Sequence, residues 1–198
     1  PFKKKIIKHT SKLNKSARLI NAVNCVSINS KIIGINTDWE GYFNSLPKQK
    51  NMKEKNIIIF GYGGAALAIH YVLWLKGFKK ISIYNRTKRK LRYEKNTKYT
   101  LSLKKVDSAL AGADIIINTT PKNPIKKGQK HLVRKKTLLS DIVYLPKETD
   151  FLKSFPENKK NFGISMLVEQ AVLSFNFWFG FKPIIDKKLM KKLDKKIT

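Results

Sequence analysis

Three small residues stand at the spacing of a dinucleotide-binding turn, Gly61-x-Gly63-x-x-Ala66. In such a turn the first glycine permits a tight bend, the second lets the backbone approach a pyrophosphate, and the third small residue lets helix and strand pack closely. The amide groups at the start of the following helix then face the phosphates. The sequence therefore predicts a dinucleotide site that includes Gly61, Gly63, Gly64 and Ala65.

A second group of polar residues indicates which dinucleotide the site prefers. In NAD sites an acidic residue at the end of the second strand holds the ribose 2′-hydroxyl. Here that position falls in the run Asn85-Arg86-Thr87-Lys88-Arg89, which has no acidic residue. The planar guanidinium of Arg86, which is always charged, suits an anionic 2′-phosphate. We therefore expect NADP rather than NAD, bound by Asn85, Arg86 and Thr87.

The segments around the turn have the patterns that such a site needs. Residues 57–60 are an apolar run typical of a strand buried on both faces of a parallel sheet. Residues 65–76 follow a helical pattern that stops at Gly77, and residues 81–84 read as a second strand. Together they predict a right-handed βαβ unit. The alternative is a generic α/β unit in which the glycines serve packing alone, and the flanking patterns argue against it.

Further elements are expected on both sides of this unit. The residue patterns predict a partly helical segment at 1–19, strands at 21–26, 32–35, 114–118, 138–143 and 161–164, and helices at 39–46, 107–113, 151–155 and 166–179, with an amphipathic helix carrying Ile185, Leu189 and Leu193 at the end. Strands that alternate with helices indicate an α/β fold.

The composition excludes several classes of protein. With 198 residues and 42% hydrophobic content, the chain is expected to be globular with one or two small domains. The formal net charge is +29, but most of the excess is lysine spread over nearly every segment, with five arginines (Arg18, Arg86, Arg89, Arg92 and Arg134). This spread predicts weak binding to polyanions and no dedicated nucleic-acid site.

Other features argue against metal, disulfide and membrane roles. Cys25 is the single cysteine, and the three histidines have no ligand spacing, so we expect no disulfide and no metal site. No apolar run approaches the roughly 20 residues of a membrane span, so a soluble protein is expected. Because the chain opens with Pro1, we expect a fragment or a processed product.

A series of short stretches, taken in order, resembles the shikimate dehydrogenase family. The stretches are Pro1-Phe2-Lys3, Asn21-Ala22-Val23-Asn24, Asn36-Thr37-Asp38, Gly61-Tyr62-Gly63-Gly64-Ala65, Asn85-Arg86-Thr87, Asp141-Ile142-Val143-Tyr144 and Gly163-Ile164-Ser165-Met166-Leu167-Val168-Glu169-Gln170-Ala171. The resemblance implies an NADP-binding Rossmann domain at 39–161 and an incomplete α/β substrate-binding domain. The substrate domain would comprise residues 1–38 and the C-terminal helices at 162–198, without the family's N-terminal portion and its substrate-binding serines.

The resemblance also implies a reaction, the reversible NADP-linked reduction of 3-dehydroshikimate to shikimate in the cytoplasm. Lys3 matches the family's catalytic lysine and Asp38 its carboxylate partner. A protonated Lys3 would polarise the ketone oxygen, and Asp38 would favour the charged form of the lysine. The residues taken alone fit another interpretation, in which Lys3 belongs to a solvated lysine run and Asp38 caps a helix.

Five further residues match binding positions of the family. Asn24 and Gln170 correspond to amides that bind substrate hydroxyls, and Tyr144 to an aromatic beside substrate and nicotinamide. Ile142 stands where a methionine often lies near the nicotinamide, and Gly163 matches a glycine whose backbone approaches that ring because it lacks a Cβ. The family's cofactor-side loop corresponds to the segment that begins at Thr119.

Three alternatives stay open from the sequence. The first is a quinate dehydrogenase, perhaps with NAD, and the second is a non-catalytic nucleotide-binding remnant. The third is a basic nucleic-acid binder, whose affinity would fall steeply with salt. The joint presence of Lys3, Asn24, Asp38 and Gln170 argues against a remnant, which needs only its fold. A monomer or homodimer is expected.

Overall fold

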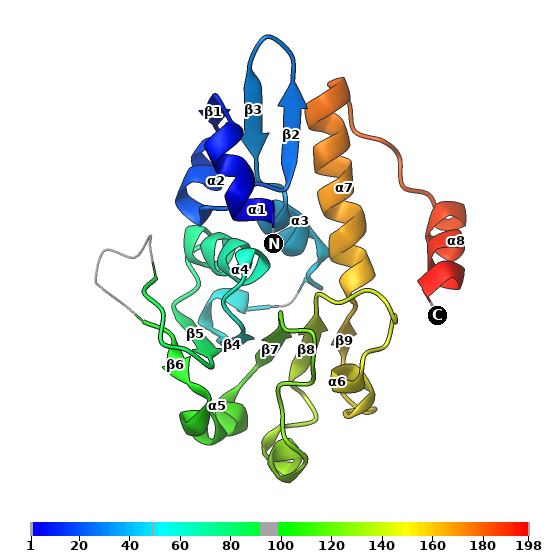
Figure 1. Cartoon of the computed structure of the whole chain (residues 1–198). Coiled ribbons are helices and arrows are strands. Elements are labelled where there is room, and N and C mark those ends of the chain that lie inside the picture. Colours follow the sequence, from blue (N-terminus) through cyan, green and yellow to red (C-terminus); the bar gives the residue numbers. More distant parts are fainter. Residues whose placement is uncertain (1, 49, 92–98, 198) are drawn as a thin grey trace.

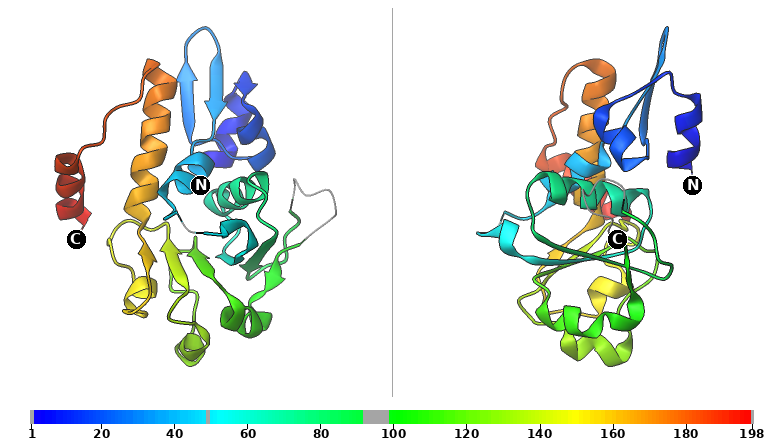
Figure 2. Two further views of the ribbon diagram at one scale, coloured as in Figure 1. Left: turned by 180° about the vertical axis from the view of Figure 1, so that it is seen from behind. Right: turned by 90° about the vertical axis from the view of Figure 1, so that its left-hand side faces the viewer.

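The computed structural model describes residues 2–48, 50–91 and 99–197. Pro1, which opens the first matching stretch, and Arg92, one of the five arginines, lie outside the described residues. The chain forms two sheets, a small one at the top of Figure 1 and a larger one below it. Figure 2 shows the same two layers from behind and from the side.

The larger sheet has six strands in the order β6-β5-β4-β7-β8-β9, and every pair of neighbours is parallel. Its strands are β4 (Asn56–Phe60), β5 (Lys80–Asn85), β6 (Leu101–Ser102), β7 (Ile115–Asn118), β8 (Leu138–Asp141) and β9 (Lys160–Asn161). This parallel sheet confirms the predicted α/β class. Strand β4, which pairs with β7 near the centre of the sheet, is the apolar run that the sequence predicted to be buried on both faces.

Strand β4 shows how the sheet is covered on both faces. Ile57 and Ile59 pack with helix α4 (Gly64–Leu75) and helix α3 (Asp38–Ser45) on one face. Ile58 and Phe60 pack on the other face with the helices α5 (Asp107–Gly112) and α6 (Asp150–Lys153). Successive side chains of a strand point to opposite faces, so an unbroken apolar run is what this position requires.

The smaller sheet has the order β1-β3-β2 and stands beside α1 (Phe2–Lys5) and α2 (Lys15–Ile20). Its strands are β1 (Lys12–Leu13), β2 (Cys25–Ile28) and β3 (Ile32–Ile35), with β2 and β3 antiparallel and β1 parallel to β3. The strand expected at 21–26 begins later than predicted. Asn21 adopts a left-handed conformation with φ 58° and ends α2, so the segment extends only from Cys25.

Helix α3 lies between the two sheets, and α7 (Gly163–Phe179) runs from the larger sheet up beside strand β2 of the smaller one (Figure 1). Near its far end the indole Nε1 of Trp178 donates to the carbonyl of Val26 in β2, at 2.9 Å. The strand expected at 161–164 is wrong after its first residue, because β9 ends at Asn161 and Gly163 already begins α7. A short apolar run does not by itself separate strand from helix.

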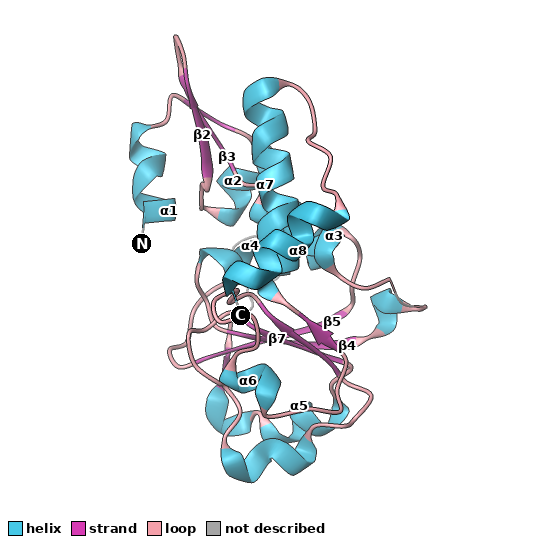
Figure 3. Cartoon of the chain, turned by 90° about the vertical axis from the view of Figure 1, so that its right-hand side faces the viewer, coloured by secondary structure: helices cyan, strands magenta, loops and turns pink. Residues whose placement is uncertain are grey.

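A last helix, α8 (Lys187–Ile197), stands at the side of the body, in front in the view of Figure 3. Its Asp194 forms an ion pair with Lys147 at 2.9 Å. Short 3-10 helices at Ile6–His9, Met52–Glu54, Leu103–Lys105 and Lys127–Leu132 complete the described elements. Within the described part of the chain, no helix is both long enough and apolar enough to span a membrane.

Candidate active site

The glycine turn lies between β4 and α4 and has the predicted geometry. Gly61 has φ +107°, and a Cβ there would lie 2.4 Å from Oγ1 of Thr119, so that only glycine fits. Thr119 itself donates from Oγ1 to the carbonyl of Phe60 at 2.6 Å. At Gly63, the residue before α4, a Cβ would meet no atom within 4 Å. The turn therefore leaves open space in front of the helix N-terminus, as a pyrophosphate would need.

The residues expected to bind the 2′-phosphate lie next to this turn. The amide of Gly61 donates to the carbonyl of Tyr84 near the end of β5, at 2.9 Å. Asn85 follows, and its Nδ2 donates to the carbonyl of Thr87 at 2.7 Å, which fixes the bend of the chain. Arg86 is exposed. The structure thus brings the two predicted cofactor motifs to one edge of the sheet.

Lys3 and Asp38 form an ion pair, with Nζ and Oδ2 2.5 Å apart. The Asp38 side chain is only 5% exposed and the Lys3 side chain 43% exposed, whereas Lys4 and Lys5 are exposed residues. Asp38 is the first residue of α3, and its carboxylate accepts from Lys3. Lys3 is therefore distinct from its lysine neighbours, and Asp38 is more than a helix cap.

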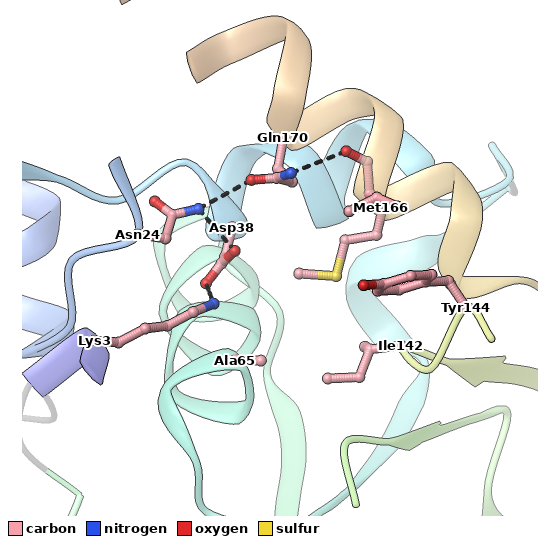
Figure 4. Close-up of a pocket in the computed structure, with 10 residues that line it drawn as sticks. Lys3, Asn24, Asp38, Ala65, Ile142, Tyr144, Met166 and Gln170 are labelled. Atoms are coloured by element: carbon pink, nitrogen blue, oxygen red, sulfur yellow. Dashed lines mark hydrogen bonds and ion pairs between the residues drawn. The ribbon is translucent and has the colours of Figure 1, made fainter. Parts of the chain in front are cut away.

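Two amide side chains continue this ion pair into a network (Figure 4). Nδ2 of Asn24 donates to Oδ1 of Asp38 at 2.9 Å and to Oε1 of Gln170 at 3.1 Å. Nε2 of Gln170 in turn donates to the carbonyl of Leu167 at 3.0 Å. The hydroxyl of Thr37 accepts from Asn24 at 2.9 Å. Lys3, Asn24, Asp38 and Gln170, from four separate segments of the chain, therefore meet at one polar wall.

The network borders a cavity of about 360 Å³, which is shown in Figure 4. Side chains of α4, of the segment after β8 and of α7 form the remainder of its wall. The complete lining is Lys3, Asn24, Asp38, Ala65, Ile142, Tyr144, Gly163, Met166, Leu167 and Gln170. Eight of these ten are predicted site residues, and Ala65 connects the glycine turn with the cavity.

Some predicted cofactor residues lie outside the cavity. Gly61, Gly63, Gly64, Asn85, Arg86, Thr87 and Thr119 surround the turn and do not line the cavity wall. The two groups are still near each other, because a Cβ added to Gly64 would lie 3.4 Å from Cδ of Lys3. An extended ligand could therefore run from the edge of the sheet past the turn and into the cavity.

Sequence reasoning missed Thr37, Met166 and Leu167. Gly163, Met166, Leu167 and Gln170 recur at helical spacing, which places them along one side of α7. This spacing was a usable signal, because two residues of the series had already been assigned to the site. Thr37 had no such signal, since a threonine directly before a helix is an ordinary feature.

Gly163 is needed for a reason other than the expected approach of a nicotinamide. A Cβ at this position would lie 2.5 Å from the carbonyl oxygen of Val143 and 2.6 Å from that of Ile142. The start of α7 therefore contacts the backbone that follows β8. Gly163 also lines the cavity, but the backbone of the protein already occupies the space of the missing side chain.

A buried carboxylate holds the segment that carries Ile142 and Tyr144. Asp141 accepts from the hydroxyl of Thr149 at 2.6 Å, from the amide of Val143 at 3.0 Å and from Nδ2 of Asn118 at 3.1 Å. Burial raises the pKa of Asp141 above its usual value, although these donors act in the opposite direction. Because Ile142 and Tyr144 lie beside these bonds, Asp141 fixes one wall of the cavity.

The arrangement fits a nucleotide-dependent reaction at a carbonyl or hydroxyl group. A cation bonded to a buried carboxylate can hold or move a proton at an oxygen atom. The open turn and Arg86 suit a phosphorylated cofactor. Among the described residues there is no group of three side chains placed to hold a metal ion.

Two family models match parts of the chain. The family described as Shikimate / quinate 5-dehydrogenase matches residues 45–149, and the Shikimate 5'-dehydrogenase C-terminal domain matches residues 163–192.

Two relatives, each named shikimate dehydrogenase (NADP(+)), match almost the whole chain. The protein of Geobacillus sp. (strain WCH70) is 35% identical over 211 residues, which cover 98% of this chain and 75% of the relative. The protein of Methanocaldococcus jannaschii is 35% identical over 216 residues with the same two shares. A crystal structure of shikimate dehydrogenase in complex with NADP+ has a TM-score of 0.81 at 33% identity, covering 100% of this chain and 75% of that one. The chain belongs to the shikimate dehydrogenase family.

Proposed function

We propose that this protein catalyses the reversible, NADP-dependent reduction of 3-dehydroshikimate to shikimate, a step in the synthesis of chorismate and the aromatic amino acids. The observation that carries the proposal is the ion pair of Lys3 with the buried Asp38, at the wall of a cavity that reaches the glycine turn. Membership of the family supplies the reaction class. The geometry supplies residues for each part of it.

Lys3 and Asp38 manage the proton at the reacting oxygen. In the reduction, the ketone oxygen gains negative charge as hydride arrives, and a nearby ammonium stabilises that charge. Asp38 orients the ammonium toward the cavity wall through their ion pair, in which Nζ and Oδ2 lie 2.5 Å apart. The pair thereby delivers a proton to the oxygen, and in the reverse direction removes it.

Asn24 and Gln170 are proposed to bind hydroxyl groups of the substrate. Amide side chains both donate and accept, so they suit hydroxyls, which do the same. Nδ2 of Asn24 donates to Oε1 of Gln170 at 3.1 Å. The two amides are therefore already aligned, and a substrate hydroxyl can exchange with part of this pairing. Tyr144, at the opposite wall, would contact the substrate ring.

The cofactor, when bound, supplies hydride. We propose that Gly61, Gly63, Gly64 and Ala65 bind its pyrophosphate through backbone amides and open space. Asn85, Arg86 and Thr87 would hold the adenosine end and its 2′-phosphate, and Thr119, Ile142 and Gly163 would adjoin the nicotinamide end. The proximity of Gly64 to Lys3 supports this path, because it places the two groups of residues side by side.

The same proposal divides the chain into functional parts. Residues 1–38 and 162–198 would belong to the substrate-binding side, and residues 39–161 to the NADP-binding side. The two separate sheets support this division. A cytoplasmic enzyme that is a monomer or a homodimer is proposed, and light scattering after gel filtration measures the oligomeric state.

Initial rates of reduced-cofactor formation test the proposal. The purified chain is assayed with shikimate or quinate, each in the presence of NADP or NAD. We expect the highest kcat/KM with shikimate and NADP. A preference for quinate would favour the other activity in the family description. Cofactor binding without turnover of either substrate would contradict the proposal and favour a non-catalytic remnant.

A further inference from the structure

A buried tyrosine links α3 to the larger sheet at a distance from the cavity. Tyr42 is 1% exposed, and its hydroxyl donates to Oγ of Ser140 in β8 at 3.1 Å. Nδ2 of Asn161 in β9 donates to the same oxygen at 3.2 Å. Burial raises the pKa of Tyr42, so the phenol keeps its proton and acts as a donor. A hydrogen bond in an apolar core is directional, and it therefore fixes how these elements pack.

On the α3 side, this bond lies close to the proposed proton-transfer pair. Asp38 precedes Tyr42 by one turn of the helix, so the two residues lie above one another on α3. Gly41 lies between Asp38 and Tyr42 in α3. A Cβ at Gly41 would lie 2.6 Å from the backbone nitrogen of Gln170 in α7. The position of α3 therefore determines where both Asp38 and Gln170 stand at the polar wall.

On the β8 side, the bond lies close to the opposite wall. Ser140 and Ile142 are two positions apart, and in an extended chain such residues point to the same face. Ile142 accordingly packs against the core cluster that contains Tyr42, whereas Asp141 bonds to Asn118 and Thr149. Ile142 lines the cavity across from Asp38 (Figure 4). The Tyr42–Ser140 bond thus connects the helix that carries Asp38 to the strand that leads to Ile142, and neither bonded residue lines the cavity itself.

We propose that Tyr42, through Ser140, is a positioning residue that sets the distance between the substrate wall and the nicotinamide wall during hydride transfer. This inference rests on the proposed function. Each ligand would be held mainly by one wall, so its affinity depends little on the spacing between walls. The rate of hydride transfer depends on that spacing, because misplacement of reacting groups by about 1 Å can cost roughly a hundredfold in rate.

The test uses Tyr42→Phe, Ser140→Ala and the double variant, each with NADP and shikimate. Tyr42→Phe keeps the ring in the core and removes only the hydroxyl. We expect kcat to fall about ten- to a hundredfold. The Kd for NADP and the KM for shikimate should stay within about twofold of wild type, because neither residue lines the cavity. Ser140→Ala also removes the acceptor of Asn161, so it can be the slower single variant. The double variant should be no slower than the slower single variant, since both substitutions remove the Tyr42–Ser140 bond.

A kinetic isotope effect separates positioning from a general loss of stability. Shikimate deuterated at the oxidised carbon should show a larger and more temperature-dependent effect on kcat in Tyr42→Phe than in wild type. Ile57→Val is the matched control. It weakens the same core cluster, but it lies near the start of β4, away from the glycine turn that follows the strand. This control should leave both kcat and the isotope effect unchanged.

The outcomes distinguish the inference from the proposed function. An active wild type whose kcat and isotope effect are unchanged by Tyr42→Phe would overturn the positioning role alone. So would an Ile57→Val variant that reproduces the loss. A wild-type chain that binds NADP but forms no NADPH from shikimate would contradict the proposed function, and this inference with it.

Discussion

Lys3 and Asp38 are bonded to each other but have different surroundings. The carboxylate is buried and also accepts from Asn24, whereas almost half of the lysine side chain is exposed. Removal of the lysine would leave a buried charge without its cation, which is unfavourable. The exposed lysine can also approach a ligand in the cavity. The pair therefore combines a buried carboxylate, Asp38, with a lysine that a substrate can reach. Proton transfer to a substrate oxygen requires both.

Arg86 allows a test of cofactor choice at one residue. We expect Arg86→Ala to raise the Kd for NADP by roughly ten- to a hundredfold, since a hydrogen bond to a charged group contributes about 1.5–3 kcal/mol. The Kd for NAD should change little, because NAD has no 2′-phosphate. Titration calorimetry measures both, and Arg89→Ala, a nearby exposed arginine, is the control. Equal losses for NADP and NAD would contradict this role.

Asp141 predicts a dependence of stability on pH. Its pKa in the folded protein is raised above the usual 3.8 by burial, so in the window above that value the folded state binds more protons than the unfolded state. The contribution of Asp141 to the free energy of unfolding therefore falls as pH rises through the window. Asp141→Asn should remove this dependence, as measured by urea unfolding at several pH values.

The control for this experiment is Asp150→Asn, which changes an exposed carboxylate nearby. It should leave the pH dependence of wild type in place. A stability difference between wild type and Asp141→Asn that is constant or grows with pH would show that the pKa of Asp141 is not raised.

The sequence predicted some of these residues on physical grounds and others only through family resemblance. The glycine turn and Arg86 could be derived, because a phosphate-binding turn requires small residues at fixed spacing. Lys3 and Asp38 could not, since a lysine in a basic run and an acid at a helix start are ordinary features. Only the folded chain brings them together, and their separation in sequence gives no sign of it.

At the scale of elements, the close crossing of α3 and α7 depends on Gly41. A Cβ there would lie 2.6 to 2.7 Å from backbone and side-chain atoms of Gln170. We expect Gly41→Ala to lower the free energy of unfolding by about 1–3 kcal/mol, as overpacking does. It should also raise the KM for shikimate, because it displaces the helix that carries Gln170.

Gly112→Ala is the matched control for this substitution. Gly112 ends α5, and a Cβ there would meet no atom within 4 Å. This variant should be neutral or slightly stabilising, because alanine is the better helix former. Urea unfolding and steady-state kinetics measure both variants. A Gly41→Ala protein as stable and active as Gly112→Ala would show that the crossing tolerates a methyl group.

Element prediction succeeded for most helices and strands, including the four-residue strand β3, and failed for the two-residue strands. Strands β4, β5 and β7 and helices α3, α4 and α7 lie within a few residues of their predicted bounds. Strand β1 has two residues and β9 has two, too few to show any alternation. Their positions depend on pairing with β3 and β8, and this pairing cannot be predicted from the local sequence.

At the scale of the whole molecule, the net charge of +29 predicts a response to salt. Self-repulsion destabilises a compact chain with such an excess of one sign. When ionic strength rises from about 0.01 to 0.15 M, the Debye length falls from about 30 to 8 Å. We therefore expect the thermal midpoint to rise by a few degrees, as measured by differential scanning fluorimetry.

Affinity for NADP should change in the opposite direction over the same range, because salt screens the attraction between the basic protein and an anionic ligand. NAD, with less charge, should show a weaker dependence. A nucleic-acid binder would instead show steep salt dependence toward oligonucleotides and no need for the cofactor. A thermal midpoint that falls with salt would mean that favourable ion pairs outweigh the repulsion.

The most direct test of the account is the rate of NADPH formation from shikimate by wild type, Lys3→Ala and Lys4→Ala at saturating NADP. Lys4 is the exposed neighbour of Lys3 and serves as the control. We predict that Lys3→Ala lowers kcat by about a hundred- to ten-thousandfold, as loss of an acid–base group does. Its Kd for NADP should match that of wild type, and Lys4→Ala should be fully active. Equal activity of Lys3→Ala and Lys4→Ala would contradict the account, because Lys3 would then be only one of many solvated lysines.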